Sequence, residues 1–592
     1  MTDYYESIFP GLNEAKESIS AINRKLAFIR LILFVAVAGC VIAGFAMDKN
    51  IFLFAGAAVA LVVFIIVCVI HSKSKYMELL LDEKIKAAER YINRGKGDYS
   101  KMVFDGSEFK DNSHPFASDL DVFGPHSLFE LYNISHSVFG RNAFADKLKL
   151  KHFKDLNRAS ISKLQKLVEL LSDQEFLLDY ESISAVHPIA KVPDALLALC
   201  AKEKNLSGSF KILYKIMPFL WLAPIGFLIA GMTSYLRISI LAIILINLIV
   251  WFAVSKQDYS DIFKAGMISK QAQAVKVRVE CLLSEEKLME AFVPEYLDES
   301  FEDDLNALIK ACGICSLREQ PISALILNAV MPFDLLCADR LLDWSSKHGK
   351  SFMGNVAGLG DIESLMCAAV PGIIAKTSCF PVIEDGKQAY FEGYDMTHPL
   401  LDPAKAVSNS VKIDSEQALI TGSNMSGKTT LIRTVGVMLV LSYMGAKVPS
   451  SKVNCSVMRI MTSMRIADSL EESMSTFKAE LIRIGAIVEA SETEIPLLFL
   501  IDEVFRGTNS QDRTDGAEIL LNKLGKPYIA GFMTTHDYAL CDRAAERKQE
   551  NIVFFHFSER YEGDEVIFDY KLRPGLSHES NARFLMRLVG IV

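Results

Sequence analysis

The chain has 592 residues, of which 51% are hydrophobic, and its formal net charge is −9. This balance excludes a globally basic protein that binds nucleic acid without specificity, because such proteins need excess Lys and Arg to neutralise phosphates. The high hydrophobic share indicates membrane segments. The one close cysteine pair, Cys312 and Cys315, has no second pair at zinc-ligand spacing, so we interpret it as two buried thiols on a helix.

Two long apolar runs near the N-terminus predict a transmembrane helical hairpin. They cover residues 26–47 and 51–70 of an N-terminal segment 1–75, and the first carries a single charge, Arg30 near its start. About 20 apolar residues, rising about 1.5 Å each, cross a hydrocarbon core of about 30 Å. The length of the first run and the second run directly after it argue against a cleaved signal peptide.

A second transmembrane hairpin is predicted within residues 211–255. Its arms are residues 213–232 and 238–254, and Pro224 predicts a kink in the first arm. The alternative is a pair of buried core helices. Lys and Arg flank the two hairpins on the side of the long segments, and the turns carry only Lys49 and Arg237. The positive-inside rule therefore predicts a multi-pass protein of the cytoplasmic membrane, with its large segments on the cytoplasmic side.

The remaining sequence is helical first and mixed later. Residues 76–210 and 256–380 carry apolar residues at helical spacing and predict a mainly α-helical core or lever, with loop and short strand over residues 102–124. In residues 381–592, and most clearly from Gln417 onward, β-rich runs alternate with helical ones. This alternation predicts an α/β domain with a mostly parallel sheet covered by helices.

A complete phosphate-binding motif lies in this last segment. Gly422–Thr429 matches G-x-x-x-x-G-K-[ST], after an apolar strand and before a helix predicted from Thr429 to about Met444. The glycines let backbone N–H groups surround phosphate oxygens, and the helix N-terminus adds a favourable dipole. Lys428 would hold the β- and γ-phosphates of ATP, and the Thr429 hydroxyl would bind Mg²⁺. The predicted nucleotide-binding residues are Gly422, Ser423, Asn424, Met425, Ser426, Gly427, Lys428, Thr429 and Thr430.

Two further strand ends carry polar side chains suited to ATP hydrolysis. The apolar run 496–501 ends in Asp502 and Glu503, which are placed to support Mg²⁺ and to polarise the attacking water, respectively. His536 ends another predicted strand, where it could contact the γ-phosphate. The alternatives are an acidic pair that caps a helix and an ordinary polar strand end. The predicted catalytic residues are therefore Glu503, Lys428 and His536, and the predicted metal ligands are Thr429 and Asp502.

These stretches resemble the MutS family of ATPases. The matching segments are TGSNMSGKTT, GAKVPSS, DSLEESMSTFKAEL, LFLIDEVFRGTNSQDRTDG and TTHDYAL, in the order of the family. The resemblance implies a P-loop ATPase that works as a dimer with two composite ATP sites. Ser475 and Thr476 match the segment that reaches the nucleotide of the partner subunit in the family, although Ser473 stands where the family usually has glycine.

The departures from the family concern the substrate. A membrane hairpin stands where the amino-terminal mismatch-reading domain would be, and the second hairpin falls where core or clamp helices are expected. We therefore expect a membrane-anchored branch in which ATP drives a dimeric lever or clamp. DNA is an open partner, and mismatch recognition does not transfer from the family to this chain. Two alternatives remain: a transport ATPase of the ABC type, although no LSGGQ-like segment is present, and a membrane scaffold that acts on a protein.

Overall fold

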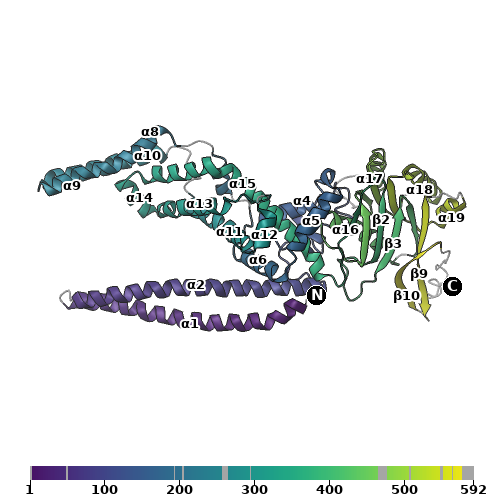
Figure 1. Cartoon of the computed structure of the whole chain (residues 1–592), viewed down its shortest axis with the longest axis horizontal. Coiled ribbons are helices and arrows are strands. Elements are labelled where there is room, and N and C mark those ends of the chain that lie inside the picture. The colour runs from purple at the N-terminus through teal and green to yellow at the C-terminus, as the bar shows by residue number, and fades with distance from the viewer. Residues whose placement is uncertain are drawn as a thin grey trace. The chain divides into compact units, whose positions relative to one another are not determined.

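The structure is a computed structural model and forms two compact units (Figure 1). The first unit comprises residues 1–134, 144–178 and 364–592, and the second comprises residues 135–143 and 179–363. The five segments predicted from the sequence do not coincide with these two units, because each unit combines stretches from several segments. The five-segment division stays a prediction. The residues that the structure describes are 3–47, 51–191, 194–202, 206–255, 264–293, 295–423, 425–464, 476–505, 509–546, 551–562 and 565–576.

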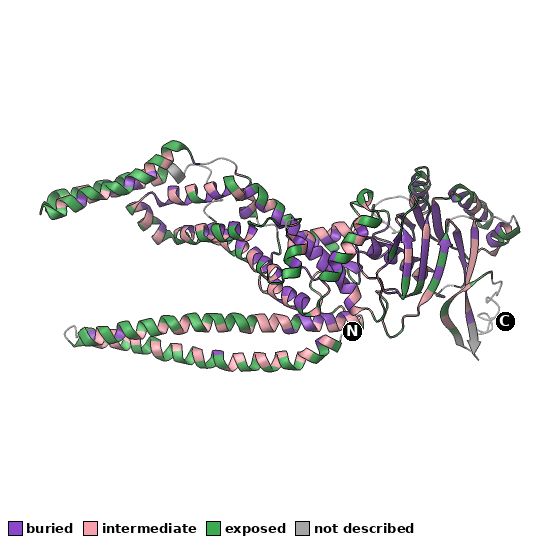
Figure 2. Ribbon diagram, in the orientation of Figure 1, coloured by how far each residue is buried: buried purple, intermediate pink, exposed green. Residues whose placement is uncertain are grey.

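An antiparallel pair of long helices, α1 (Asp3–Ala46) and α2 (Ile51–Lys96), begins the first unit. Its polar half is joined by side-chain contacts: the rings of Tyr5 and Tyr91 stack at 4.4 Å, and Asn23 Nδ2 donates to Glu78 Oε2 at 2.6 Å. Beyond these contacts the helices are apolar, and Figure 2 shows this half as largely exposed. An 18-residue apolar window of α1 is 0% buried and one of α2 is 6% buried. Such a surface is unfavourable in water.

The second unit is helical in its described residues. A buried ion pair lies at its centre, with Arg278 Nε 3.1 Å from Glu363 Oε1. The thiols of Cys312 and Cys315 are buried on α13, as the sequence predicted, and desolvation raises the pKa of Cys312 to about 12. The helices that lie wholly within this unit are α7 (Asp194–Cys200), α8 (Gly208–Ile216), α9 (Leu222–Ile229), α10 (Thr233–Ser255), α11 (Ala265–Leu283), α12 (Glu286–Phe292), α13 (Phe301–Cys315) and α14 (Pro321–Val330), with the 3-10 turns η3 (Met217–Trp221) and η4 (Ser316–Arg318).

The predicted second hairpin is helical in both arms, with an interruption near Pro224. The 3-10 turn η3 separates α8 from α9 and ends three residues before this proline. The proline ring would clash with the carbonyl of Leu220 in a regular α-helix, which gives a physical reason for the tighter turn. The described residues hold five helices long and apolar enough to cross a membrane, and four of them form the two hairpins. The fifth, α15 (Phe333–Ile374), is 72% buried over its apolar window and is a core helix.

The short strand predicted within residues 102–124 is wrong. All of these residues are described, and they form turns with one 3-10 helix, η1 (Ser107–Phe109). The carboxylate of Asp105 accepts from the backbone N–H of Ser107 at 2.9 Å, and Asp111 does the same for Ser113 at 2.9 Å. Such local side-chain bonds compete with strand pairing. The remaining helical elements are α3 (Leu128–Tyr132), α4 (Val138–Leu148), η2 (Phe153–Asp155), α5 (Arg158–Leu170) and α6 (Gln174–Val186).

The C-terminal part of the first unit contains two sheets. The smaller sheet has the order β1-β5-β2-β3, with β1 (Val382–Glu384), β2 (Tyr390–Met396), β3 (Asn409–Asp414) and β5 (Lys452–Ser456). The larger has the order β10-β9-β4-β8-β7-β6, with β4 (Gln417–Thr421), β6 (Arg459–Ser463), β7 (Leu497–Asp502), β8 (Ile529–Thr534), β9 (Ile552–Glu562) and β10 (Glu565–Pro574). The accompanying helices are α16 (Lys428–Tyr443), α17 (Thr476–Ala490), α18 (Ser510–Leu524) and α19 (Tyr538–Glu546).

The larger sheet confirms the predicted mostly parallel α/β arrangement. Only β10 pairs antiparallel, with β9, and every other neighbouring pair runs parallel. Strand β4 lies between β8 and β9, and all five of its residues are buried. The strand order therefore reverses at the carboxyl end of β4, where ligands bind in open sheets of this kind.

Candidate nucleotide site

The predicted phosphate loop joins β4 to α16. Two of its glycines have positive φ, +146° at Gly422 and +103° at Gly427. A side chain at Gly422 would also lie 2.9 Å from Ser426 Oγ and 3.1 Å from the carbonyl oxygen of Phe557. Glycine is therefore required at this position for both backbone conformation and space. Asn424, predicted to contact the nucleotide, lies outside the described residues.

Lys428 begins α16 and is only 5% exposed. Its ammonium donates to the carbonyl oxygens of Gly422 and Ser423, each at 2.8 Å, and lies 3.2 Å from His536 Nε2. The carbonyl groups of the loop thus hold the Lys428 ammonium between the loop and the segment that follows β8. The structure brings together two residues that the sequence placed 108 positions apart.

The predicted metal ligands are in direct contact. Thr429 Oγ1 donates to Asp502 Oδ2 at 3.0 Å, and Thr534 Oγ1 donates to Asp502 Oδ1 at 2.6 Å. A hydroxyl and a carboxylate are hard oxygen ligands of the kind that Mg²⁺ prefers alongside phosphate oxygens and water. The donor set therefore fits Mg²⁺, and Thr534 fixes the carboxylate that would hold it.

Glu503 and His536 form a pair beside this contact. Glu503 Oε1 lies 2.7 Å from His536 Nε2, and both side chains are partly exposed. The backbone of Glu503 has φ +52°, a conformation rare for residues other than glycine, and its N–H bonds the carbonyl and the hydroxyl oxygens of Thr534 at 3.2 and 3.1 Å. Strained backbone held by a neighbouring strand is characteristic of functional sites. The role predicted for this carboxylate, to polarise the attacking water, stays a prediction.

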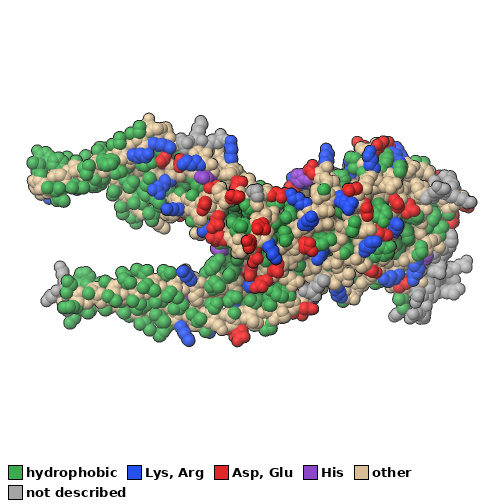
Figure 3. Space-filling view, in the orientation of Figure 1, with side chains coloured by type: hydrophobic (Ala, Val, Ile, Leu, Met, Phe, Trp, Pro, Cys, Tyr) green, Lys and Arg blue, Asp and Glu red, His purple; other side chains and the backbone are tan. Residues whose placement is uncertain are grey.

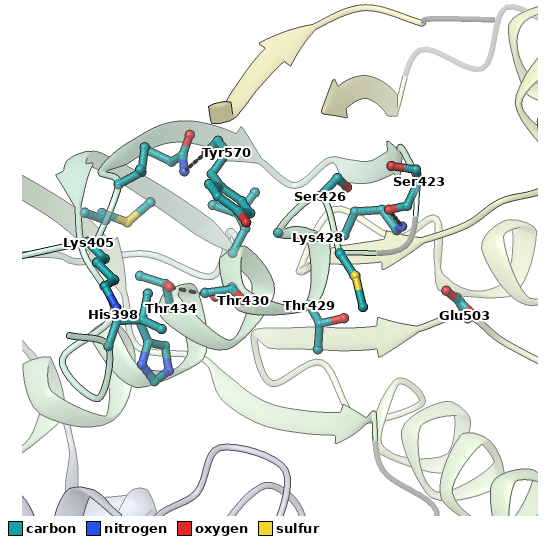
Figure 4. Close-up of a pocket in the computed structure, with 17 residues that line it drawn as sticks. His398, Lys405, Ser423, Ser426, Lys428, Thr429, Thr430, Thr434, Glu503 and Tyr570 are labelled. Atoms are coloured by element: carbon teal, nitrogen blue, oxygen red, sulfur yellow. Dashed lines mark hydrogen bonds between the residues drawn. The ribbon is translucent and has the colours of Figure 1, made fainter. Parts of the chain in front are cut away.

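A cavity of about 470 Å³ is lined by the phosphate loop, by Glu503 of this pair and by residues on the other side of the loop. Figure 4 shows Tyr570, His398 and Lys405 on one side of the loop and Glu503 on the other. Burial lowers the pKa of His398 to about 4, so its imidazole is neutral at neutral pH. The cavity is large enough to hold a nucleoside beside the phosphate loop.

The structure shows how β10 places Tyr570 in this cavity. The register of β10 against β9 shifts between Phe568 and Leu572, and Tyr570 has φ +54° within this irregularity. Asn409 holds it from β3, because its Nδ2 donates to the Tyr570 carbonyl at 2.9 Å and its Oδ1 accepts from the Leu572 N–H at 2.8 Å. These cavity residues were not predicted as site residues, since they lie outside the phosphate-loop and strand-end motifs and meet the loop only through the fold.

Besides Asn424, two further predicted residues have no contacts that the structure describes. Ser475 lies outside the described residues, and Thr476 is described only as the first residue of α17. Their predicted contact with the nucleotide of a partner subunit stays a prediction.

Comparison with known proteins identifies the C-terminal region. Residues 418–591 match the family model described as MutS domain V. The DNA mismatch repair protein MutS of Pelotomaculum thermopropionicum is 32% identical over 246 residues, which are 40% of this chain and 27% of that protein. The proteins of the same name from Natronomonas pharaonis and Prochlorococcus marinus are 30% and 25% identical over 38% and 44% of this chain. The chain spans only 26–29% of the length of these three relatives.

Proposed function

Since the chain is a member of the MutS family through residues 418–591, we propose that it binds ATP with Mg²⁺ and hydrolyses it. One observation carries this proposal: five side chains from three separate segments meet at the carboxyl ends of β4, β7 and β8. They are Lys428, Thr429, Asp502, Glu503 and His536. The MutS match favours this function over an ABC-type transporter. Release of phosphate by the purified full chain, dependent on Mg²⁺, tests the proposal, and an absence of release would overturn it.

The contacts within the site suggest a role for each of its residues in ATP binding and hydrolysis. Loop N–H groups and Lys428 would bind the phosphates. Asp502 and Thr429 would hold Mg²⁺, which would neutralise charge on the transferred phosphoryl group. Glu503 accepts a hydrogen bond from the attacking water and orients it. His536 helps to position both side chains, because its Nε2 lies 2.7 Å from Glu503 Oε1 and 3.2 Å from Lys428 Nζ.

The nucleoside is proposed to occupy the cavity beside Tyr570. Replacing Tyr570 with alanine should raise the KM for ATP by about tenfold and leave kcat nearly unchanged, because stacking on an aromatic ring contributes about 1–3 kcal/mol to base binding. Steady-state hydrolysis measures both constants. Tyr570→Phe keeps the ring and is the matched control. Equal KM values for Tyr570→Ala and Tyr570→Phe would contradict a stacking role.

We propose that two copies of the chain form a dimer with composite ATP sites. The proposal rests on the family membership and on the match of Ser475 and Thr476 to the segment that reaches a partner's nucleotide. The relatives are named for DNA mismatch repair, which favours duplex DNA as the partner of the dimer. Binding to plain, branched and mismatched duplexes at several salt concentrations tests this, because phosphate contacts produce a salt slope. A flat response would exclude DNA.

We further propose that both helical hairpins anchor the protein in the cytoplasmic membrane, with the nucleotide site on the cytoplasmic side. The apolar side chains of the first hairpin support this, because they are exposed over a length that matches a hydrocarbon core. In the polar half, Lys16 pairs with Asp82, and Arg30 bonds His71 at 2.9 Å where the apolar half begins. The charged contacts therefore stop where the membrane would start.

Membrane anchoring predicts how the protein fractionates. Full-length protein should remain with membranes through washes in concentrated salt and dissolve only in detergent, because burial of apolar side chains is not screened by ions. A peripheral protein held by charge should leave in the salt wash and serves as the control. Full-length protein in the salt-washed soluble fraction would rule out integral spans.

A further inference from the structure

The short helix α14 of the second unit exposes an apolar face. Its ten residues carry no charge, and four of them on one face are exposed: Ile322 at 75%, Leu325 at 49%, Ile326 at 57% and Val330 at 46%. Helix α14 packs against α10 of the second hairpin, whose outer face is also apolar and exposed. Figure 3 shows apolar side chains gathered over this part of the unit. At about 1.5 Å per residue, ten residues cannot cross a bilayer.

The corner after α14 bonds its backbone groups within the protein. Asn247 of α10 donates to the carbonyl oxygens of Ala329 and Val330, both at 2.9 Å, and Trp221 Nε1 donates to the Val330 carbonyl at 2.8 Å. A helix end in water does not need such donors, because water bonds its last carbonyls. In hydrocarbon each unbonded group costs several kcal/mol, so internal partners are required.

The donors of the same corner also have protein partners. The N–H groups of Met331 and Phe333 bond the Leu327 and Met331 carbonyls at 3.0 and 2.7 Å. The Asp334 N–H donates to Asn328 Oδ1 at 3.0 Å. Pro332, which lies between Met331 and Phe333, has no N–H. Asn247 and Asn328 are each 1% exposed. The backbone groups named here are therefore bonded within the protein on both the donor and the acceptor side, whereas the side-chain oxygen of Asn247 is buried without a hydrogen-bond partner among the described residues.

The position of Asn247 sets the depth of this corner. Asn247 lies seven residues inside the end of the predicted span at Val254, which is about 10 Å along a helix. The Ala329 and Val330 carbonyls lie at the same level. If α10 spans the membrane, the end of α14 lies below the interface and within the hydrocarbon.

The charges and indole groups near the corner fit this depth. Asp334 is 1% exposed and accepts a hydrogen bond from Arg318 Nε at 2.8 Å, so this acid and this base, one on each side of the uncharged stretch, neutralise each other. Trp251 Nε1 also bonds Asp334, at 3.0 Å, four residues nearer the membrane surface than Asn247. Tryptophan at the interface and paired ions near it are the usual accompaniments of a membrane-embedded segment.

We propose that α14 is a re-entrant helix, which enters the bilayer beside the second hairpin and returns through the α14–α15 corner. Its exposed face contacts lipid acyl chains. The inference rests on the proposed membrane insertion of α9 and α10. It places α14, which was predicted from the sequence to belong to the helical core, within the membrane as well.

Photolabelling of the full-length protein in lipid vesicles tests this inference. An apolar carbene reagent that partitions into the bilayer is activated by light, and the modified peptides are identified by mass spectrometry. Peptides from α14 should be modified to within about threefold of those from α9 and α10, because all three face acyl chains. Helix α18 is the internal control, because Ile519 is 67% exposed but lies in the α/β part of the first unit. Its peptides should stay at background.

The possible outcomes separate the inference from the proposal on which it rests. Labelled α9 and α10 with α14 at the level of α18 would overturn the re-entrant helix and leave the hairpin in the membrane. Background labelling of all three would overturn the hairpin as well. A water-soluble carbene reagent should give the inverse pattern.

A variant of the capping residue tests the corner itself. Asn247→Leu removes the donor to Ala329 and Val330, and it should lower labelling of α14 several-fold without changing that of α9. Ser239→Ala is the matched control on α10, because Ser239 Oγ bonds only the Leu236 carbonyl of its own helix, at 2.9 Å. Unchanged labelling of α14 in Asn247→Leu would contradict the capping role.

Discussion

Replacement of Lys428 with alanine is expected to abolish ATP binding at concentrations that saturate the native protein. Lys428 is 5% exposed, and its ammonium donates to the Gly422 and Ser423 carbonyls of the phosphate loop. Hydrogen bonds to a charged group contribute about 1.5–3 kcal/mol each, so the loss of two phosphate contacts weakens binding by about 100-fold or more. A titration with a fluorescent ATP analogue measures the affinity.

The control for this variant is a lysine of the same domain outside the site. Lys523 is exposed on α18, and Lys523→Ala should bind ATP as the native chain does. Circular dichroism of both variants separates a binding defect from a folding defect. An unchanged affinity in folded Lys428→Ala would refute the assigned role of the lysine.

The core of the site could be predicted from the sequence because its residues lie next to strong local signals. The phosphate loop needs glycines at fixed positions, and the structure gives Gly422 and Gly427 the positive φ that requires them. The buried strand that ends in Asp502 reads as an unbroken apolar run, and β7 has that composition. Because β7 pairs in parallel with β8, Thr534 at the end of β8 lies beside Asp502 at the end of β7. The pairing of the two strands, and not the motif, determines this contact.

The nucleoside side of the cavity could not be predicted in this way. Tyr570 and Asn409 are 161 positions apart and meet through a register shift in β10. Single residues at strand irregularities leave no periodic pattern in a sequence. His398 likewise follows β2 outside the nucleotide-binding motifs. The fold places it in the lining of the cavity, where burial lowers the pKa of its imidazole and keeps it neutral.

The sequence also led to an error for a segment governed by local side-chain bonds. Residues 102–124 were predicted to include a strand, yet Asp105 and Asp111 close turns with their own neighbours. Helix α14 was assigned to the helical core for a different reason. Ten uncharged residues lie below the length that indicates a span, and no local pattern in the sequence indicates that Asn247 of α10 bonds the end of this helix.

Replacement of Glu503 with glutamine is expected to separate ATP binding from ATP hydrolysis. The carboxylate is 2.7 Å from His536 and is held by a strained backbone at the end of β7, whereas Asp502 and Thr429 keep their own contact at 3.0 Å. Glutamine preserves size and polarity but cannot accept the proton of an attacking water, so turnover should fall by about 100- to 10,000-fold. Retained ATP on the protein after gel filtration and the rate of phosphate release measure the two effects.

Glu494 provides the matched substitution for this experiment, because it is an exposed glutamate in the turn before β7. Glu494→Gln should hydrolyse ATP at the native rate and lose bound nucleotide as the native chain does. Normal phosphate release by Glu503→Gln would exclude Glu503 as the group that accepts the proton of the attacking water, and His536 would be the next residue to replace. Loss of ATP binding together with turnover would instead assign Glu503 to the phosphate-binding contacts, since only a group needed for the ground-state complex affects both.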